Sequence, residues 1–148
     1  MDEQFIKNWI LYDIYSWKSA EKSYKNLTRK IGENSMMEFS NFERIFNEIS
    51  KENWDENVCK KNLNSYSTVI TCILNDVISG TSKEYSFLKI SNFAPKFPMI
   101  YFEYWRQKFE NGNWDFQVED SILPEAPEFT DFSTDVVKII LGNLDYEN

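Results

Sequence analysis

The segment FEYWRQKFENGNWD, residues 102–115, places three large apolar side chains at helical spacing and follows them with a helix stop. Phe102, Trp105 and Phe109 fall at i, i+3 and i+7, so a helix holds all three on one stripe. Gly112 follows as a residue that adopts positive φ without a steric penalty. The spacing therefore predicts an amphipathic helix that ends close to Gly112.

A related segment occurs about sixty residues earlier in the chain. Residues 42–49 read FERIFNEI and lead into the NWD motif at 53–55, which recurs at 113–115. Upstream, ILYDI at residues 10–14 recurs 63 positions later as ILNDV at 73–77. A period of about sixty residues predicts two tandem units of the same kind.

Each unit is expected to contain three helices. In the first unit, apolar spacing predicts a helix through Ile6, Ile10, Ile14 and Trp17, with Trp9 beside this stripe. Ser19 is placed to cap a second helix that Gly32 ends, and a third helix is expected over about 39–50.

The second unit repeats this order with an offset that changes from 63 to 60. Ser82 takes the position of the cap, and Pro95 and Pro98 interrupt the chain before the last helix. Apolar residues at 63, 66, 70, 73 and 77 keep helical spacing, so we expect a helical connection and units that pack on each other. Trp54 and Trp114 are expected to cover the ends of the two bundles.

The C-terminal part of the chain differs in composition. Residues 117–133 combine acids with Pro124 and Pro127, as is typical of a linker. Residues 134–148 follow as one more amphipathic helix, whose apolar stripe is Val137, Ile140, Leu141 and Leu144. The sequence thus predicts an all-α protein: two tandem three-helix units (1–55 and 56–116), a linker (117–133) and a terminal helix (134–148).

Composition limits the chemistry. The chain has no histidine, no glycine-rich phosphate loop and no metal-ligand spacing, so we expect no enzyme activity and no cofactor or metal. The two cysteines, Cys59 and Cys72, are expected to be reduced thiols. The acids that recur at Asp13 and Asp76 are expected to cap helices or to pair locally.

The net charge of −8 belongs mainly to the C-terminal part. Residues 1–55 hold ten acids and eight bases, residues 56–115 six acids and seven bases, and residues 116–148 eight acids and one base. The two units are thus nearly neutral, which neither demands nor forbids nucleic acid. The N-terminus does not resemble a signal peptide and no apolar run approaches a membrane span, so a cytoplasmic or nuclear location without membrane contact is expected.

The repeated unit resembles a known domain. ILYD at 10–13, SYKNL at 23–27, Ile31-Gly32, Phe42-Glu43 and the NWD motif at 53–55 are similar to the helix-turn-helix domain that opens mariner-type transposases. The copy of this domain found at the N-terminus of many nematode F-box proteins is closer still. This resemblance covers about 110 residues and implies a helix-turn-helix unit in two copies.

The residues after the units extend the resemblance. FSTDVVKIILGNLD at 132–145 is similar to the first helix of an F-box, the segment that docks on a Skp-type adaptor of a cullin-RING ubiquitin ligase. An F-box usually begins Leu-Pro, whereas this chain has Phe132-Ser133, and the remaining F-box helices are not matched. The resemblance implies adaptor docking through Val137, Ile140, Leu141 and Leu144, and we expect residues 1–148 to bind an adaptor weakly.

Two functions remain open at this point. The favoured one is a non-enzymatic protein-interaction or dimerisation module of an F-box-like protein, with an adaptor or a second copy as partner. The alternative is a transposase-derived DNA-binding protein that reads bases with its third helices. Its contact residues would be Arg44, Lys51, Arg106 and Lys108, with a basic run along the second helix at Lys18, Lys22, Lys25, Arg29 and Lys30. Glutamates lie among these bases and repel phosphate, so nucleic acid is the less favoured partner.

Overall fold

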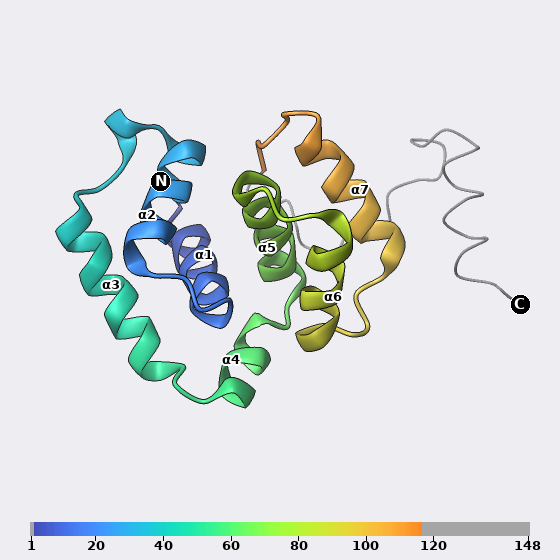
Figure 1. The fold of residues 1–148 in the computed structure, drawn as a ribbon, viewed down its shortest axis with the longest axis horizontal. Helices are drawn as coiled ribbons and strands as arrows, with labels where there is room; N and C mark the ends of the chain where they lie inside the picture. The colour runs from blue at the N-terminus through green and yellow to red at the C-terminus, as the bar shows by residue number, and fades with distance from the viewer. Residues whose placement is uncertain (1, 117–148) are drawn as a thin grey trace, which may run out of the picture.

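The computed structural model describes residues 2–116, and every regular element in this range is a helix (Figure 1). In chain order the elements are α1 (Glu3–Tyr15), α2 (Ala20–Ile31), a 3-10 turn η1 (Glu33–Ser35), α3 (Phe39–Glu52), α4 (Glu56–Leu63), α5 (Tyr66–Ser79), α6 (Lys83–Phe93) and α7 (Met99–Glu110). The predicted all-α class is confirmed. The predicted linker at 117–133 and terminal helix at 134–148 lie outside the described residues.

The helices form two groups that meet where α1 packs against α5. In Figure 1, α1, α2 and α3 lie on one side, α5, α6 and α7 on the other, and α4 joins them along the lower edge. α1 packs directly against α5, and α2 also contacts α5. The helix starts follow the repeat: α5 begins 63 residues after α1, α6 begins 63 after α2, and α7 begins 60 after α3. Superposition of the two groups remains a prediction.

The helix ends are set by the residues that the sequence singled out. The Ser19 side chain accepts a hydrogen bond from the Lys22 amide, and the Ser82 side chain accepts one from the Tyr85 amide, so each caps its helix. Gly32 ends α2 with a φ of 99°. The predicted caps and stops are thus confirmed.

The core is richest along α1 and α5. Trp9 and Ile10 of α1 and Ile70, Ile73 and Leu74 of α5 have no exposed surface. Burying a side chain of this size contributes about 1.5–3 kcal/mol, so the pair of helices dominates the apolar core.

The third helix of each group supplies its apolar stripe to the same core. Phe102, Trp105 and Phe109 of α7 are buried, as predicted. In α3 the buried residues are Phe42 and Phe46, while Ile45 and Ile49, which lie 60 positions before Trp105 and Phe109, are half-buried.

Trp17 does not belong to the stripe of the first helix, contrary to the sequence-based prediction. α1 ends at Tyr15, and Trp17 lies in the turn that follows, with φ of 62° and a relative exposure of 94%. The equivalent residue 63 positions later is Gly80, with φ of 81°. The chain reverses in the same left-handed conformation twice, once with glycine and once with tryptophan.

The prediction that both NWD tryptophans cover the bundle ends was wrong for Trp54. Its exposed fraction is 82%, and it lies between α3 and α4, one residue before the Asp55 cap of α4. Trp114 is half-buried, and its indole N–H donates to the Phe109 carbonyl at 3.0 Å.

The connection between the groups is helical but not continuous. The predicted stripe from Leu63 to Val77 is interrupted at Asn64 and Ser65, where α4 ends and α5 begins. The Ser65 side chain accepts a hydrogen bond from the Thr68 amide and so caps α5. No helix among residues 2–116 is long and apolar enough to cross a membrane.

The left-handed turns give a test by substitution. Trp17→Gly should raise the free energy of unfolding by about 1 kcal/mol, because the tryptophan has a left-handed backbone and almost no packing to lose. Gly80→Ala should lower it by about the same amount. Urea denaturation of both variants checks the prediction, and a loss of stability in Trp17→Gly would contradict it.

Candidate functional site

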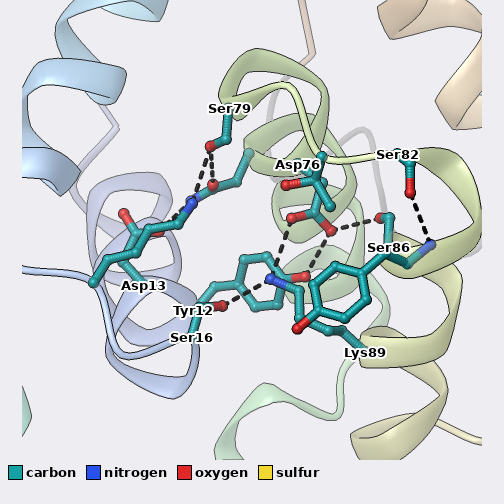
Figure 2. A network of polar contacts seen from close by, with 12 residues as sticks. Tyr12, Asp13, Ser16, Asp76, Ser79, Ser82, Ser86 and Lys89 are labelled. Carbon is teal, nitrogen blue, oxygen red and sulfur yellow. Dashed lines mark hydrogen bonds and ion pairs between the residues drawn. The ribbon is translucent and has the colours of Figure 1, made fainter.

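The two acids that recur in the repeat meet at the centre of the fold. Asp13 on α1 and Asp76 on α5 each have no exposed surface. Figure 2 shows both carboxylates in the contact between these helices, within a network of polar side chains. A buried carboxylate is costly unless hydrogen bonds and opposite charges compensate it, so their partners matter.

Each carboxylate receives a hydrogen bond from the other helix. Tyr12 Oη of α1 donates to Asp76 Oδ2 at 2.6 Å, and Asn75 Nδ2 of α5 donates to Asp13 Oδ1 at 3.1 Å. Tyr12 and Asn75 occupy equivalent positions in the repeat, one residue before each acid. The two acids were expected to cap helices or to pair locally; Asp13 does pair with Lys18 nearby, but each acid also accepts a hydrogen bond from the other group of helices.

The charges in the network are balanced by two lysines. Lys18 Nζ lies 3.5 Å from Asp13, and Lys89 Nζ lies 3.5 Å from Asp76. Each ammonium also donates across the interface, Lys18 to Ser79 Oγ at 3.1 Å and Lys89 to Ser16 Oγ at 2.9 Å. Ser16 and Ser79 occupy equivalent positions in the repeat. The lysine–serine hydrogen bonds are therefore exchanged between the two groups in the same way as the hydrogen bonds to the acids.

Part of this network could have been predicted from the sequence. Ser16 and Ser79 share the offset of 63 with the acids, as do Ser23 and Ser86, and Ser86 Oγ donates to Asp76. The lysines gave no such signal, because Lys18 and Lys89 occupy non-equivalent positions.

The protonation of the network follows from burial. Desolvation raises the pKa of Asp13, and the nearby Lys18 charge opposes this shift. Burial, followed by the Asp76 charge, raises the pKa of Tyr12 well above its usual value, so the phenol keeps the proton that it donates. The network joins α1, α5 and α6, and both of its carboxylates are buried.

The cysteines are also interior groups. Cys59 and Cys72 are both free and buried. Burial raises the pKa of the Cys59 thiol to about 11 and that of Cys72 well above its usual value, which disfavours the reactive thiolate. Among the described residues, no three His, Cys, Asp or Glu side chains gather in a way that could hold a metal ion.

The residues predicted for DNA contact are dispersed. Arg44 and Lys51 are exposed on α3, and Arg44 pairs with Glu48 at 3.4 Å. Arg106 is buried, with Nε 2.6 Å from Glu110 and Nη2 donating to the Thr81 carbonyl at 2.8 Å. It is therefore committed to the fold rather than presented to a base edge.

Lys108 and part of the basic run make contacts within the chain as well, whereas Lys22 and Lys25 are exposed. Lys108 lies over the Trp105 ring at 4.8 Å, and Lys30 lies over the Phe5 ring at 5.8 Å. Arg29 donates to the Ile78 carbonyl at 2.7 Å, at the C-terminal end of α5 where cations are favoured.

Exposed apolar residues form the remaining surface candidates. Trp17, Trp54, Tyr85 and Leu88 have exposed fractions of 94%, 82%, 59% and 67%. Tyr85 and Leu88 lie three apart on α6, so they share one face. Lys89 connects this helix to the turn before Trp17, since its Nζ binds Ser16 and lies 5.6 Å from the Tyr85 ring.

The residues predicted for adaptor docking, Val137, Ile140, Leu141 and Leu144, lie outside the described part of the chain. No family model matches the chain, and no curated protein or solved structure matches it significantly. The resemblance to the transposase and F-box proteins therefore stays a prediction.

The exchanged hydrogen bonds predict a graded loss of stability. Tyr12→Phe removes one donor to a charged acceptor and should lower the free energy of unfolding by about 1.5–3 kcal/mol. Asp76→Ala leaves the buried Tyr12 and Ser86 hydroxyls without their acceptor and Lys89 without its counter-charge, and should cost about 3–5 kcal/mol. Urea denaturation measures both, with Tyr85→Phe at an exposed ring as the control. Equal effects of Tyr12→Phe and Tyr85→Phe would contradict the assignment.

The raised pKa of Asp13 predicts a pH dependence. An acid whose folded pKa exceeds its unfolded value contributes stability at low pH that is lost as the pH rises through the folded pKa. The asparagine side chain of the variant Asp13→Asn does not titrate. The stability of Asp13→Asn relative to the wild type should therefore increase from about pH 4 upward through that pKa. A relative stability that falls over this range in urea titrations would refute the prediction.

Proposed function

We propose that the chain is a non-enzymatic protein-interaction module. The observation that carries this proposal is Trp17, which is 94% exposed and left-handed where the repeat elsewhere has Gly80. A left-handed backbone is energetically unfavourable for tryptophan. The Trp17 side chain packs on almost nothing within residues 2–116, so packing does not offset this cost. A binding role accounts for its presence, because tryptophan is among the residues that contribute most to protein interfaces.

The other exposed apolar residues support the same interpretation. Trp54 precedes α4 with 82% exposure, and Tyr85 and Leu88 face solvent on α6. Exposed aromatic side chains of this size are typical anchors of protein interfaces. The polar network is consistent with a non-enzymatic function, because Asp13 and Asp76 are buried between helices and are not accessible to a substrate.

The alternative function is a transposase-derived DNA-binding protein. The exposed bases Arg44 and Lys51 on α3 favour it. Against it, Arg106 is buried, Arg44 pairs with Glu48, and Arg29 is bound to the end of α5. A reader of base edges needs donors free to enter the groove. Protein interaction is therefore the preferred function.

The family-level proposal adds the adaptor. We propose an F-box-like protein whose stripe at Val137, Ile140, Leu141 and Leu144 contacts a Skp-type adaptor, in the cytoplasm or nucleus. Its support is the sequence resemblance given above. Affinity for residues 1–148 should be weak, and Ile140→Asp should weaken it further.

The interaction function is tested with the full chain as bait for proteins that co-precipitate with it. Trp17→Ala should reduce recovery of its specific partners at least tenfold, because about 2 kcal/mol or more is lost at such an anchor. The same variant should melt no lower than the wild type, since Trp17 packs on almost nothing. Lys22→Ala, at a nearby exposed residue, is the matched control.

Gel shifts with the same purified chain distinguish the protein-interaction function from the DNA-binding alternative. Gel shifts should give weak, non-specific binding, with Kd about 10⁻⁴–10⁻⁶ M at physiological salt. Selection of one preferred sequence at nanomolar affinity, lost in Arg44→Glu, would instead favour the DNA-binding alternative. An unchanged partner profile for Trp17→Ala would remove the main support for the interaction proposal.

A further inference from the structure

We propose that two copies of this chain exchange halves through a hinge at Asn64–Ser65, where α4 and α5 straighten into one helix. The N-terminal lobe is α1–α4 and the C-terminal lobe is α5–α7. The inference rests on the proposed interaction function and names one partner for it, a second copy of the same chain. Its test does not involve Trp17, so either proposal can fail alone.

The apolar pattern runs through the break without a change of phase. Cys59, Leu63, Tyr66, Ile70, Ile73 and Val77 are spaced by four, three, four, three and four residues. One continuous helix would hold all six on a single stripe. Neither hinge residue is glycine or proline, so nothing in the local sequence forbids helix at 64 and 65.

The break itself is held by few contacts. Asn64 has φ −88° and ψ 69°, Ser65 has φ −141° and ψ 155°, and both are exposed. The side-chain bonds of Ser65 are local: its Oγ donates to Thr68 Oγ1 at 2.8 Å and accepts from the Thr68 amide. Straightening would join 8 residues of α4 and 14 of α5, with the hinge between them, into a helix about 36 Å long.

Apart from the Ser65 cap, the contacts that opening would break lie between the lobes. They include the packing of α1 and α2 on α5, of α4 on α6, and of Tyr12 and Tyr15 on Phe93. Opening removes the Tyr12 donor from Asp76 and the Asn75 donor from Asp13, and it exposes the apolar faces of α1 and α5. An opened chain therefore needs a partner that supplies the lost hydrogen bonds and covers the exposed apolar faces.

A second opened copy is complementary to these faces. Its C-terminal lobe brings Asn75 and Ser79 to the first copy's N-terminal lobe, and its N-terminal lobe brings Tyr12 and Ser16 in return. Reciprocal exchange restores each contact between lobes twice and changes only the two hinges. Such exchange is a low-cost route to a closed dimer.

Two variants that differ only in helix propensity test the hinge. Asn64→Ala/Ser65→Ala and Asn64→Gly/Ser65→Gly both remove the Ser65 cap and the Asn64 side chain. Alanine favours helix over glycine by a factor of about five per residue, and a dimer contains four such positions. The alanine variant should therefore dimerise several hundred-fold more tightly, on the order of 600-fold. Light scattering after size exclusion measures the masses, and the wild type serves as reference.

Isotope mixing separates exchanged halves from side-by-side dimers. Natural-abundance and ¹⁵N-labelled protein are mixed, warmed toward the melting temperature, cooled and treated with an amine-reactive cross-linker. α4 carries Lys60 and Lys61, α6 carries Lys89, and the two helices pack together. In an exchanged dimer this cross-link joins different copies, so half of the α4–α6 products in an equal mix should carry mixed labels.

Mixed-label α4–α6 cross-links in the alanine dimer, and at a lower level in the warmed wild type, are the expected result. Equal monomer masses for the alanine and glycine variants would overturn the proposal. So would an alanine dimer whose α4–α6 cross-links all carry one label, since that dimer has intact monomers side by side. If the alanine variant fails to fold, absence of mixed labels in the warmed wild type at high concentration overturns it equally.

Discussion

The fold depends on two carboxylates that lie in the centre of the contact between α1 and α5. Neither Asp13 nor Asp76 touches water, so each requires donors and a positive charge within the protein. Each accepts a hydrogen bond from the opposite helix, Asp76 accepts another from Ser86 of α6, and the charges come from Lys18 and Lys89. An apolar interface would tolerate sliding, whereas these hydrogen bonds fix one register between the two helices.

Much of the fold could be predicted from the sequence, because its signals are local. Ser19, Gly32 and Ser82 end or cap their helices through their own side chains or backbone freedom. The repeat offsets of 63 and 60 reappear in the helix starts. These features need no knowledge of the partner helix, which is why pattern and cap chemistry suffice.

The failures occurred where tertiary contacts decide the outcome. Trp17 fits the apolar spacing of α1, but the chain has already turned at Ser16, and the pattern alone does not reveal this. Arg106 looks like a basic residue of a third helix, yet the Thr81 carbonyl and Glu110 hold it inside. The exchanged hydrogen bonds also depend on a tertiary contact, that of α1 with α5. Tyr12 and Asn75 donate equivalent hydrogen bonds, but they are different residue types, so the sequence does not mark them as a pair.

The exchanged network also couples the two groups of helices to each other. If each group were self-contained, a substitution in one group would leave the buried polar side chains of the other unchanged. Here a change at Tyr12 alters the surroundings of Asp76, and a change at Asn75 alters those of Asp13. Positions 64 and 62 residues apart are therefore coupled, and a substitution in one group of helices keeps the network satisfied only if the other group can compensate it.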